Sequence, residues 1–254
     1  MSLVFSSDWG SYATSFRKLV GFVRYDRGIE TAYSSGVASL YPHNLELTIY
    51  SEVTTLEGFP VNSDFERFNE IEDGFVNHGW DFYLVGIISG EGRRRFIFWL
   101  SDDAISNVSD IVGSLLGKHI HSIRHTVNLT LYDSFQFFLD NIEPNMSEHV
   151  QMITRKICEQ MKDRGELFIT PRTIDFYCTF FDSKRIASTV KKLKQLGYSE
   201  VSTSFNKTSG CRLHITKVLI PTVAQLTFAT NEIISILEPI GAHFAYWYSP
   251  VYNF

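Results

Sequence analysis

The chain has 254 residues, of which 44% are hydrophobic and 20% are charged, so a sizeable core is expected and global disorder is excluded. Aromatic residues make up 15% of the sequence, which favours β-sheets, because pleated surfaces accommodate aromatic side chains well. The net charge is −9 over residues 1–145 and +4 over residues 146–254. The acidic half would repel a phosphate backbone, so direct binding of nucleic acid is not the favoured function.

The three cysteines, Cys158, Cys178 and Cys211, lie far apart and form no CxxC pair. This spacing fits neither a disulfide framework nor a zinc finger, and it is typical of a reducing cytosol. The N-terminus has no charged-then-apolar signal region, and no run of about 18 apolar residues occurs. The sequence therefore predicts a cytoplasmic protein with no membrane segment.

In the first half of the chain, an aromatic-rich opening stretch contains one strand pattern at residues 19–25. After it, hydrophobic periodicity predicts the order strand, helix, strand, strand, helix, strand. The expected strands are residues 45–50, 82–88, 95–100 and 121–131, and the expected helices are residues 62–79 and 105–116. Glycines at positions 90 and 92 favour a tight turn between the second and third of these strands.

The second half opens with an expected helix at residues 147–164 and then repeats the same order. The expected strands are residues 174–181, 200–205, 213–219 and 244–251, with helices after Asp182 or Ser183 and after Pro221. This order is the split βαβ pattern, a four-stranded antiparallel sheet with two helices on one face. We therefore predict an α+β protein of two ferredoxin-like (βαββαβ) domains with antiparallel sheets, over residues 1–142 and 147–254.

Motifs that could carry chemistry are weak. Glu72 and Asp73 lie among five carboxylates of the helix at residues 62–79, where carboxylates can act as acid and base or hold Mg²⁺ but usually form the wet face. His119 and His121 would point the same way in a strand, with no Cys or carboxylate nearby to complete a metal site. No nucleophile elbow, zinc-protease motif or P-loop occurs. The sequence thus predicts no catalytic residue, no cofactor and no metal site.

Four segments of the second half resemble the regulator of RNase E activity B (RraB-like) family. They are residues 171–176 (PRTIDF), 181–183 (FDS), 193–198 (LKQLGY) and 237–247 (LEPIGAHFAYW). In the last segment Gly241, Phe244 and Trp247 fit the family's usual ending. Ala242, Ala245 and Tyr246 depart from that ending, and its acidic residue is lost.

The first half resembles the domain of unknown function that is often fused ahead of RraB-like domains. The likeness rests on Trp9, Tyr12, residues 58–60, 71–73 and 92–99, Tyr132, Asp133 and Phe137. Together the two resemblances imply a bacterial cytosolic protein. The RraB-like family implies a protein inhibitor of the endoribonuclease RNase E that binds the scaffold region of the enzyme.

The leading hypothesis is therefore a non-enzymatic protein-interaction module whose partner is another protein, such as an RNA-processing endoribonuclease. We expect the partner at an exposed sheet edge, a helix face or the aromatic C-terminal strand. The candidate partner-binding residues are Asp175, Tyr246, Trp247 and Tyr248. Packing into the core is the competing interpretation of that strand.

Two alternatives from other classes are kept. A metal-dependent or carboxylate-based hydrolase would need a deep pocket that holds Glu72 and Asp73 beside Arg95. Direct RNA binding would need exposed aromatic side chains and positive charge on a sheet face, and the charge of the first half argues against it.

Overall fold

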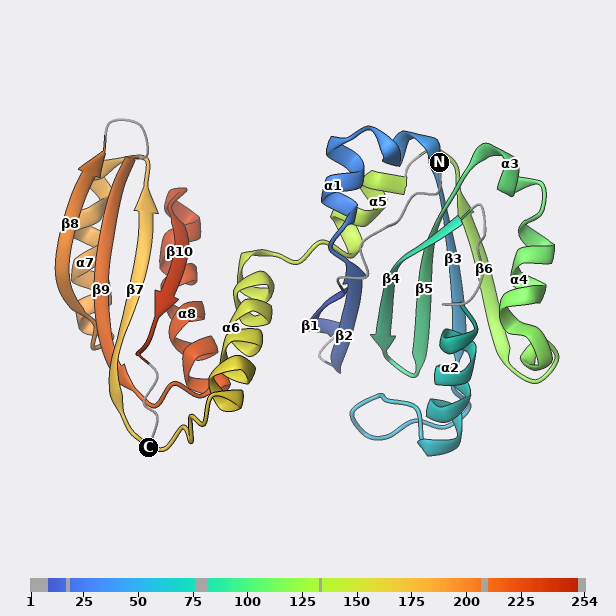
Figure 1. The fold of residues 1–254 in the computed structure, drawn as a ribbon, viewed down its shortest axis with the longest axis horizontal. Helices are drawn as coiled ribbons and strands as arrows, with labels where there is room; N and C mark the ends of the chain where they lie inside the picture. Colours follow the sequence, from blue (N-terminus) through green and yellow to red (C-terminus); the bar gives the residue numbers. More distant parts are fainter. Residues whose placement is uncertain (1–8, 17–18, 76–81, 133, 207–209, 251–254) are drawn as a thin grey trace. The chain divides into compact units, whose positions relative to one another are not determined.

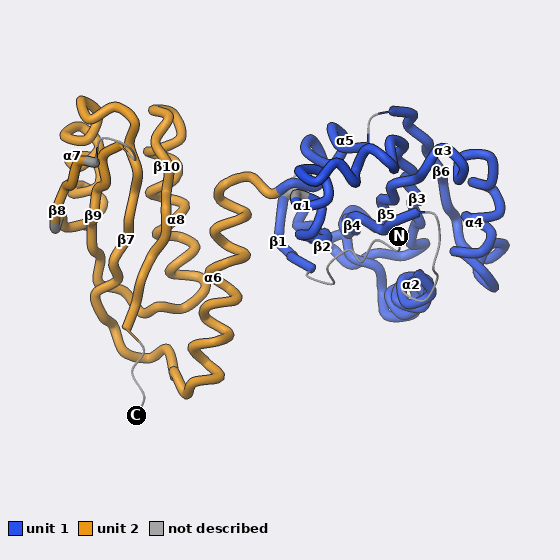
Figure 2. The backbone as a smooth tube through the Cα atoms, turned by 45° about the horizontal axis from the view of Figure 1, so that its top comes forward, with its two compact units in different colours: residues 1–143 blue, residues 144–254 orange. Residues whose placement is uncertain are grey.

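The structure, a computed structural model, describes residues 9–16, 19–75, 82–132, 134–206 and 210–250. It divides into two compact units, Met1–Glu143 and Pro144–Phe254, which Figure 2 shows in two colours. Each unit has its own hydrophobic core and, within the described residues, one antiparallel sheet. Among the described helices, none combines the length and apolar character that crossing a lipid bilayer requires.

The sheet of unit 1 has six described strands in the order β1-β2-β4-β5-β3-β6 (Figure 1). These strands are β1 (Trp9–Phe16), β2 (Leu19–Asp26), β3 (His43–Tyr50), β4 (Phe82–Gly90), β5 (Arg93–Leu100) and β6 (Arg124–Thr130). The helices are α1 (Ile29–Ser34), α2 (Asn62–Phe75), α3 (Asp102–Ile105), α4 (Val108–Leu116) and α5 (Ser134–Asn141). Strands β4-β5-β3-β6 with α2 and α4 form the ferredoxin-like motif, and the hairpin β1–β2 extends it at β4.

Helices cover parts of both faces of this sheet. Phe96 and Phe98 of β5 pack in a core with residues of α2 and α4 on one face. On the opposite face, Trp99 donates a hydrogen bond from Nε1 to the carbonyl oxygen of Ser134 at 3.1 Å, and its ring contacts Phe138 of α5. Burial on both faces explains why β5 is almost continuously apolar after its three arginines. The predicted end of α2 near Gly79 lies outside the described residues.

Unit 2 has the sheet order β10-β7-β9-β8, which again is the ferredoxin-like arrangement. Its strands are β7 (Arg172–Phe180), β8 (Ser199–Asn206), β9 (Gly210–Leu219) and β10 (His243–Tyr248), and its helices are α6 (Met146–Asp163), α7 (Ile186–Gln195) and α8 (Val223–Leu237). The predicted last strand thus ends at Tyr248, and Val251 lies outside the described residues. The chain is therefore an α+β protein with two ferredoxin-like units.

Local signals fix the helices of unit 2. Asn145 and Glu148 form a capping box at the start of α6, and the Thr222 hydroxyl accepts a hydrogen bond from the backbone N–H of Gln225 at the start of α8. All three helices contribute to one core with the inward side chains of the sheet, and Figure 1 shows α7 and α8 behind it. Among the described residues of unit 2, no helix lies over the other face of the sheet, and the side chains of that face are half-buried or exposed. We call this surface the open face.

Candidate functional site

Strand β10 lies at one edge of the sheet of unit 2, and a β-bulge decides which of its side chains reach the open face. Phe244 pairs with Cys178 and Tyr246 pairs with Tyr177, so Ala245 is an extra residue in β10. Without the bulge, alternation would place Tyr246 on the same side as Phe244. With it, Tyr246 and Tyr248 point outward and are 47% and 58% exposed, whereas Trp247 is 7% exposed.

Trp247 packs on the helix side of the sheet. Its Nε1 donates a buried hydrogen bond to the Thr154 hydroxyl of α6 at 2.9 Å, so both the ring and its polar atom are satisfied inside the unit. This contact ties the edge strand β10 to α6. Of the four candidate residues, the open face therefore carries Asp175, Tyr246 and Tyr248, and the core carries Trp247.

Three rings form a ladder across the open face. The Tyr177 ring stacks on Tyr246 with centroids 4.5 Å apart and on His214 at 4.5 Å with an interplanar angle of 8°. The ladder crosses strands β10, β7 and β9 because Tyr177 pairs directly with both neighbours in the sheet register. We call Tyr246, Tyr177 and His214 the ring ladder.

A carboxylate flanks the ring ladder. Nε2 of His214 donates a hydrogen bond to Oδ1 of Asp175 at 2.7 Å, which fixes the plane of the imidazole against Tyr177. Desolvation raises the pKa of the Tyr177 phenol above its ordinary value, and the nearby negative charge of Asp175 raises it further. The ladder is thus an ordered aromatic surface, with the Asp175 carboxylate hydrogen-bonded to its third ring.

Sequence reasoning missed Tyr177 and His214. Both could be found from strand alternation: Tyr177 is out of phase with the inward Phe176 and Cys178, and His214 is flanked by the buried Leu213. What the alternation does not reveal is which strands are neighbours. The sheet order supplies that, and it brings the two residues together.

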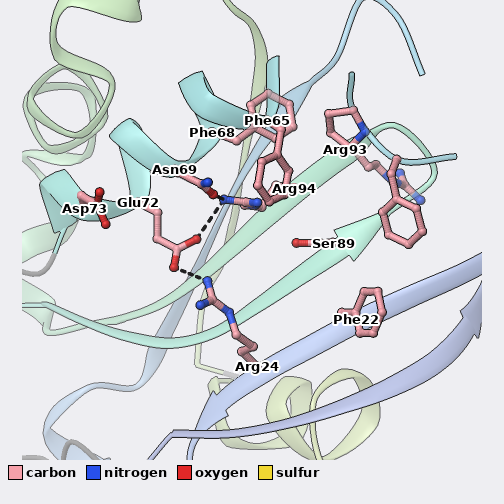
Figure 3. Close-up of a pocket in the computed structure, with 12 residues that line it drawn as sticks. Phe22, Arg24, Phe65, Phe68, Asn69, Glu72, Asp73, Ser89, Arg93 and Arg94 are labelled. Atoms are coloured by element: carbon pink, nitrogen blue, oxygen red, sulfur yellow. Dashed lines mark hydrogen bonds and ion pairs between the residues drawn. The ribbon is translucent and has the colours of Figure 1, made fainter. Parts of the chain in front are cut away.

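Unit 1 contains a pocket of about 620 Å³ beside α2 (Figure 3). We call it the arginine pocket; it is lined by Phe22, Arg24, Phe59, Pro60, Phe65, Phe68, Asn69, Glu72, Asp73, Ser89, Arg93 and Arg94. The register explains its floor, because Phe22 of β2 pairs with Ser89 of β4, and Ser89 pairs with Arg94 of β5. The added hairpin β1–β2 therefore supplies one wall and α2 supplies the other.

Two arginines share one carboxylate in the arginine pocket. Glu72 accepts a hydrogen bond from Arg94 Nη1 at 2.9 Å and another from Arg24 Nη2 at its second oxygen, as Figure 3 shows. Arg94 Nη1 also donates to Asn69 Oδ1 at 2.9 Å, and the guanidinium lies 5.6 Å from the ring centroids of both Phe65 and Phe68. Glu72 is thus committed to two ion pairs.

The acidic helix does not gather the residues that a hydrolase was expected to use. Arg95 projects from the opposite face of β5 to Arg94 and pairs with Glu46 at 2.5 Å. It does not line the arginine pocket with Glu72 and Asp73.

The histidines expected in the last strand of unit 1 lie elsewhere. Strand β6 begins only at Arg124, so the expectation that His119 and His121 share a strand face is wrong. His119 ends a short 3₁₀ helix and its Nε2 lies 3.1 Å from Glu70 Oε2. In the part of the chain that the structure describes, no three His, Cys, Asp or Glu side chains gather as metal ligands would.

Comparison with known proteins places a family on unit 2. The solved structure of a protein proposed to be a glycine cleavage system transcriptional repressor aligns with 82% of this chain and 98% of its own chain, at 9% sequence identity. The TM-score of 0.24 is too low for this alignment to indicate a shared fold or function. The comparison with curated proteins gave no match. Residues 151–247 match the family described as RraB, regulator of ribonuclease activity B, and so the RraB-like resemblance of the C-terminal unit is confirmed.

Proposed function

We propose that this chain is a non-enzymatic inhibitor of the endoribonuclease RNase E and that the open face of unit 2 binds the enzyme. The observation that carries the proposal is the RraB match over residues 151–247, since that family regulates ribonuclease activity. The ferredoxin-like fold of the two units does not by itself identify a function, because this fold hosts many functions. The site must therefore be argued from its surface.

The open face has the composition of a protein-binding surface. Tyrosine is enriched at interfaces because it buries a large rigid ring while its hydroxyl remains satisfied by water or a partner. Tyr246 and Tyr248 present two such rings at the edge strand, and Tyr177 fixes the first of them by stacking. Little side-chain entropy would be lost when a partner covers rings that are already ordered.

The hydrogen-bonded pair of Asp175 and His214 gives the surface direction. Asp175 lies on β7 and His214 on β9, the two central strands of the sheet. A partner segment would therefore meet tyrosine rings at β10 and polar groups at β7 and β9. Trp247 contributes indirectly, because its contact with Thr154 holds the edge strand in place.

Binding of the purified chain to RNase E of the same bacterium tests this proposal. We expect saturable binding by surface plasmon resonance and slower cleavage of a labelled RNA by the enzyme. Tyr246→Ala and Tyr248→Ala should each weaken binding by about tenfold, the loss typical of a moderate interface anchor. Phe228→Ala is the matched control, since Phe228 is 65% exposed on α8, in the helix layer on the other side of the sheet.

Two results would contradict the proposal. One is the absence of binding to RNase E; the other is an equal loss from Phe228→Ala and Tyr246→Ala. A salt-sensitive shift of single-stranded RNA that Tyr246→Ala abolishes would instead assign the ring ladder to base stacking. That experiment separates an RNA ligand from a protein partner.

The geometry favours this function over the hydrolase. Glu72 is held by two arginines, so it would have to break ion pairs before it could act as a base. We also propose a cytoplasmic location. Cys158, Cys178 and Cys211 are free and buried, an arrangement that suits a reducing compartment.

A further inference from the structure

The arginine pocket of unit 1 holds a cluster with more positive than negative charge. Arg24 and Arg94 share the carboxylate of Glu72, which leaves one positive charge over these three side chains. Asp73 also lines the pocket, but it is exposed and points away from the two arginines (Figure 3). Arg93, at the other end of the pocket, has its own partner in Glu91 at 2.5 Å. The excess is therefore confined to the cluster formed by Arg24, Glu72 and Arg94.

Arg94 is buried, so the excess positive charge of the cluster is poorly solvated. Its side chain is 7% exposed, and its Nε is buried with no hydrogen-bond partner. Burial lowers the pKa of the Arg94 guanidinium from its ordinary value, and the neighbouring charge of Arg24 lowers it further, while Glu72 opposes both. A buried cation with too few acceptors is costly, and an anion bound in the pocket would offset that cost.

Much of the remaining lining is apolar. Phe22 and Phe59 pack with ring centroids 5.7 Å apart, and Phe65, 48% exposed, lies on the opposite wall of the pocket (Figure 3). Pro60 adds an aliphatic surface, and Ser89 offers a hydroxyl on the floor. The volume of about 620 Å³ is in the range of pockets that enclose small organic ligands.

We propose that the arginine pocket binds a small organic monoanion: a carboxylate attached to an aryl or other apolar body. The carboxylate would lie against Arg24 and Arg94, whose planar guanidinium groups match its geometry, and the apolar body would lie among the phenylalanine rings. A single negative charge balances the single excess positive charge. A dianionic phosphate would overshoot it, in a half of the chain whose net charge is already −9.

Isothermal titration calorimetry of the full chain with 3-phenylpropionate tests the charge requirement. We expect 3-phenylpropionate to bind at least about tenfold more tightly than its uncharged amide, because a charge-assisted hydrogen bond is lost in the amide. Acetate, which lacks the ring, and phenyl phosphate, which carries two charges, should both bind more weakly. A short peptide that ends in phenylalanine presents the same ring and carboxylate at the end of a chain. Tighter binding of this peptide than of 3-phenylpropionate would identify the ligand as a protein C-terminus, and weaker binding would identify it as a free acid.

Two substitutions in the cluster should change the affinity in opposite directions. Arg24→Gln removes the excess charge and should weaken 3-phenylpropionate binding about tenfold, whereas Glu72→Gln raises the excess to two charges and should strengthen it. Arg67→Gln is the matched control, because Arg67 belongs to the same helix but pairs with Asp64 and does not line the pocket. The control should bind like the unmodified chain.

The proposal is overturned if the amide binds as tightly as the acid, if none of the acids binds, or if Arg24→Gln and Arg67→Gln behave alike. It is equally overturned if both cluster variants weaken binding while their circular dichroism shows them folded. If Glu72→Gln does not fold, Arg24→Gln against Arg67→Gln still decides. None of these outcomes depends on RNase E, so the pocket and the ribonuclease proposal can fail separately.

Discussion

The two units share one strand order but differ in what lies on the second face of the sheet. In unit 1, α5 packs there against Trp99, and the hairpin β1–β2 widens the sheet beyond the ferredoxin-like motif. In the described part of unit 2 no added element covers the second face, which carries the ring ladder. Topology therefore does not decide what a unit of this fold can bind. The hairpin added at the sheet edge makes a pocket with α2 in unit 1, and the second face of unit 2 is left open.

The largest difference in stability should come from truncating one aromatic ring on the second face of each sheet. Trp99→Ala removes a fully buried side chain and its hydrogen bond to Ser134, so we expect a loss of about 3–5 kcal/mol from the stability of unit 1. Tyr177→Ala removes a half-exposed ring, so we expect no more than about 1 kcal/mol from unit 2. Hydrogen exchange with mass spectrometry reports each unit separately. Equal losses would contradict the difference between the two faces.

A buried ion pair tests whether the two cores are independent. Arg172 Nη2 lies 2.7 Å from Glu166 Oε2, with side chains 3% and 2% exposed. Glu166→Ala leaves a buried guanidinium without its carboxylate, so unit 2 should lose about 3 kcal/mol. The loss should be at the low end for such pairs because Arg172 Nε still donates to the Ser249 hydroxyl.

The protection of unit 1 amides should not change in Glu166→Ala, and a matching loss in unit 1 would show that the two cores unfold together. The control is Glu200→Gln, which breaks an exposed pair with Lys194 and should cost less than about 1 kcal/mol.

A smaller effect follows from packing on the two second faces. A Cβ at Gly86 would lie 2.8 Å from Ile142 Cδ1 and 3.4 Å from the carbonyl oxygen of Arg24. Gly86→Ala should therefore cost about 1 kcal/mol, since the Ile142 side chain can shift only in part. Thr173→Tyr, a far larger enlargement on the open face, should change stability by no more than about 0.5 kcal/mol. Thermal denaturation of both variants checks the contrast.

The smallest predicted effect is a difference between the two units in how their stability declines at alkaline pH. Burial raises the pKa of Cys178 to about 12 and that of Cys158 to about 11, above the ordinary thiol value of 9.0. Above pH 9 the unfolded chain releases these protons while the folded chain keeps them. The stabilisation is therefore complete below pH 9 and declines as pH rises toward 11 and 12.

In unit 1, burial raises the pKa of Tyr83 from 10.0 to about 12, so its decline should begin a pH unit later. Denaturant titrations at pH 8, 9.5 and 10.5, read by hydrogen exchange, should show unit 2 weakening first. Cys178→Ala should reduce the slope for unit 2, and an unchanged slope would contradict this account.

Sequence reasoning predicted the α+β class and the repeated strand and helix order, because most strands and helices here have strong apolar periodicity. It also found the RraB-like resemblance of the C-terminal half. It missed the start of β6, since the histidines before Arg124 continue an alternating pattern that carries no hydrogen-bond information. The pairing partners of a strand are set by the rest of the sheet.

Because strand pairing is not set locally, the sequence also did not predict the arginine pocket or the ring ladder. The arginine pocket depends on Phe22 and Arg24 lying beside β4, and nothing local to residues 19–25 tells which strand they join. Strand alternation alone could not place Tyr246 and Trp247, because the extra residue Ala245 is visible only in the pairing with β7.

That extra residue makes β10 tolerant of one change in length and sensitive to another. Deleting Ala245 would set Tyr246 directly after Phe244 and opposite Tyr177, so Tyr246 and Tyr248 would stay outward and Trp247 inward. Inserting one residue between Tyr246 and Trp247 would instead turn Trp247 toward solvent and Tyr248 toward the helices. The strand can therefore lose its bulge and keep the open face, whereas a one-residue insertion beyond Tyr246 would replace a phenol on that face with an indole.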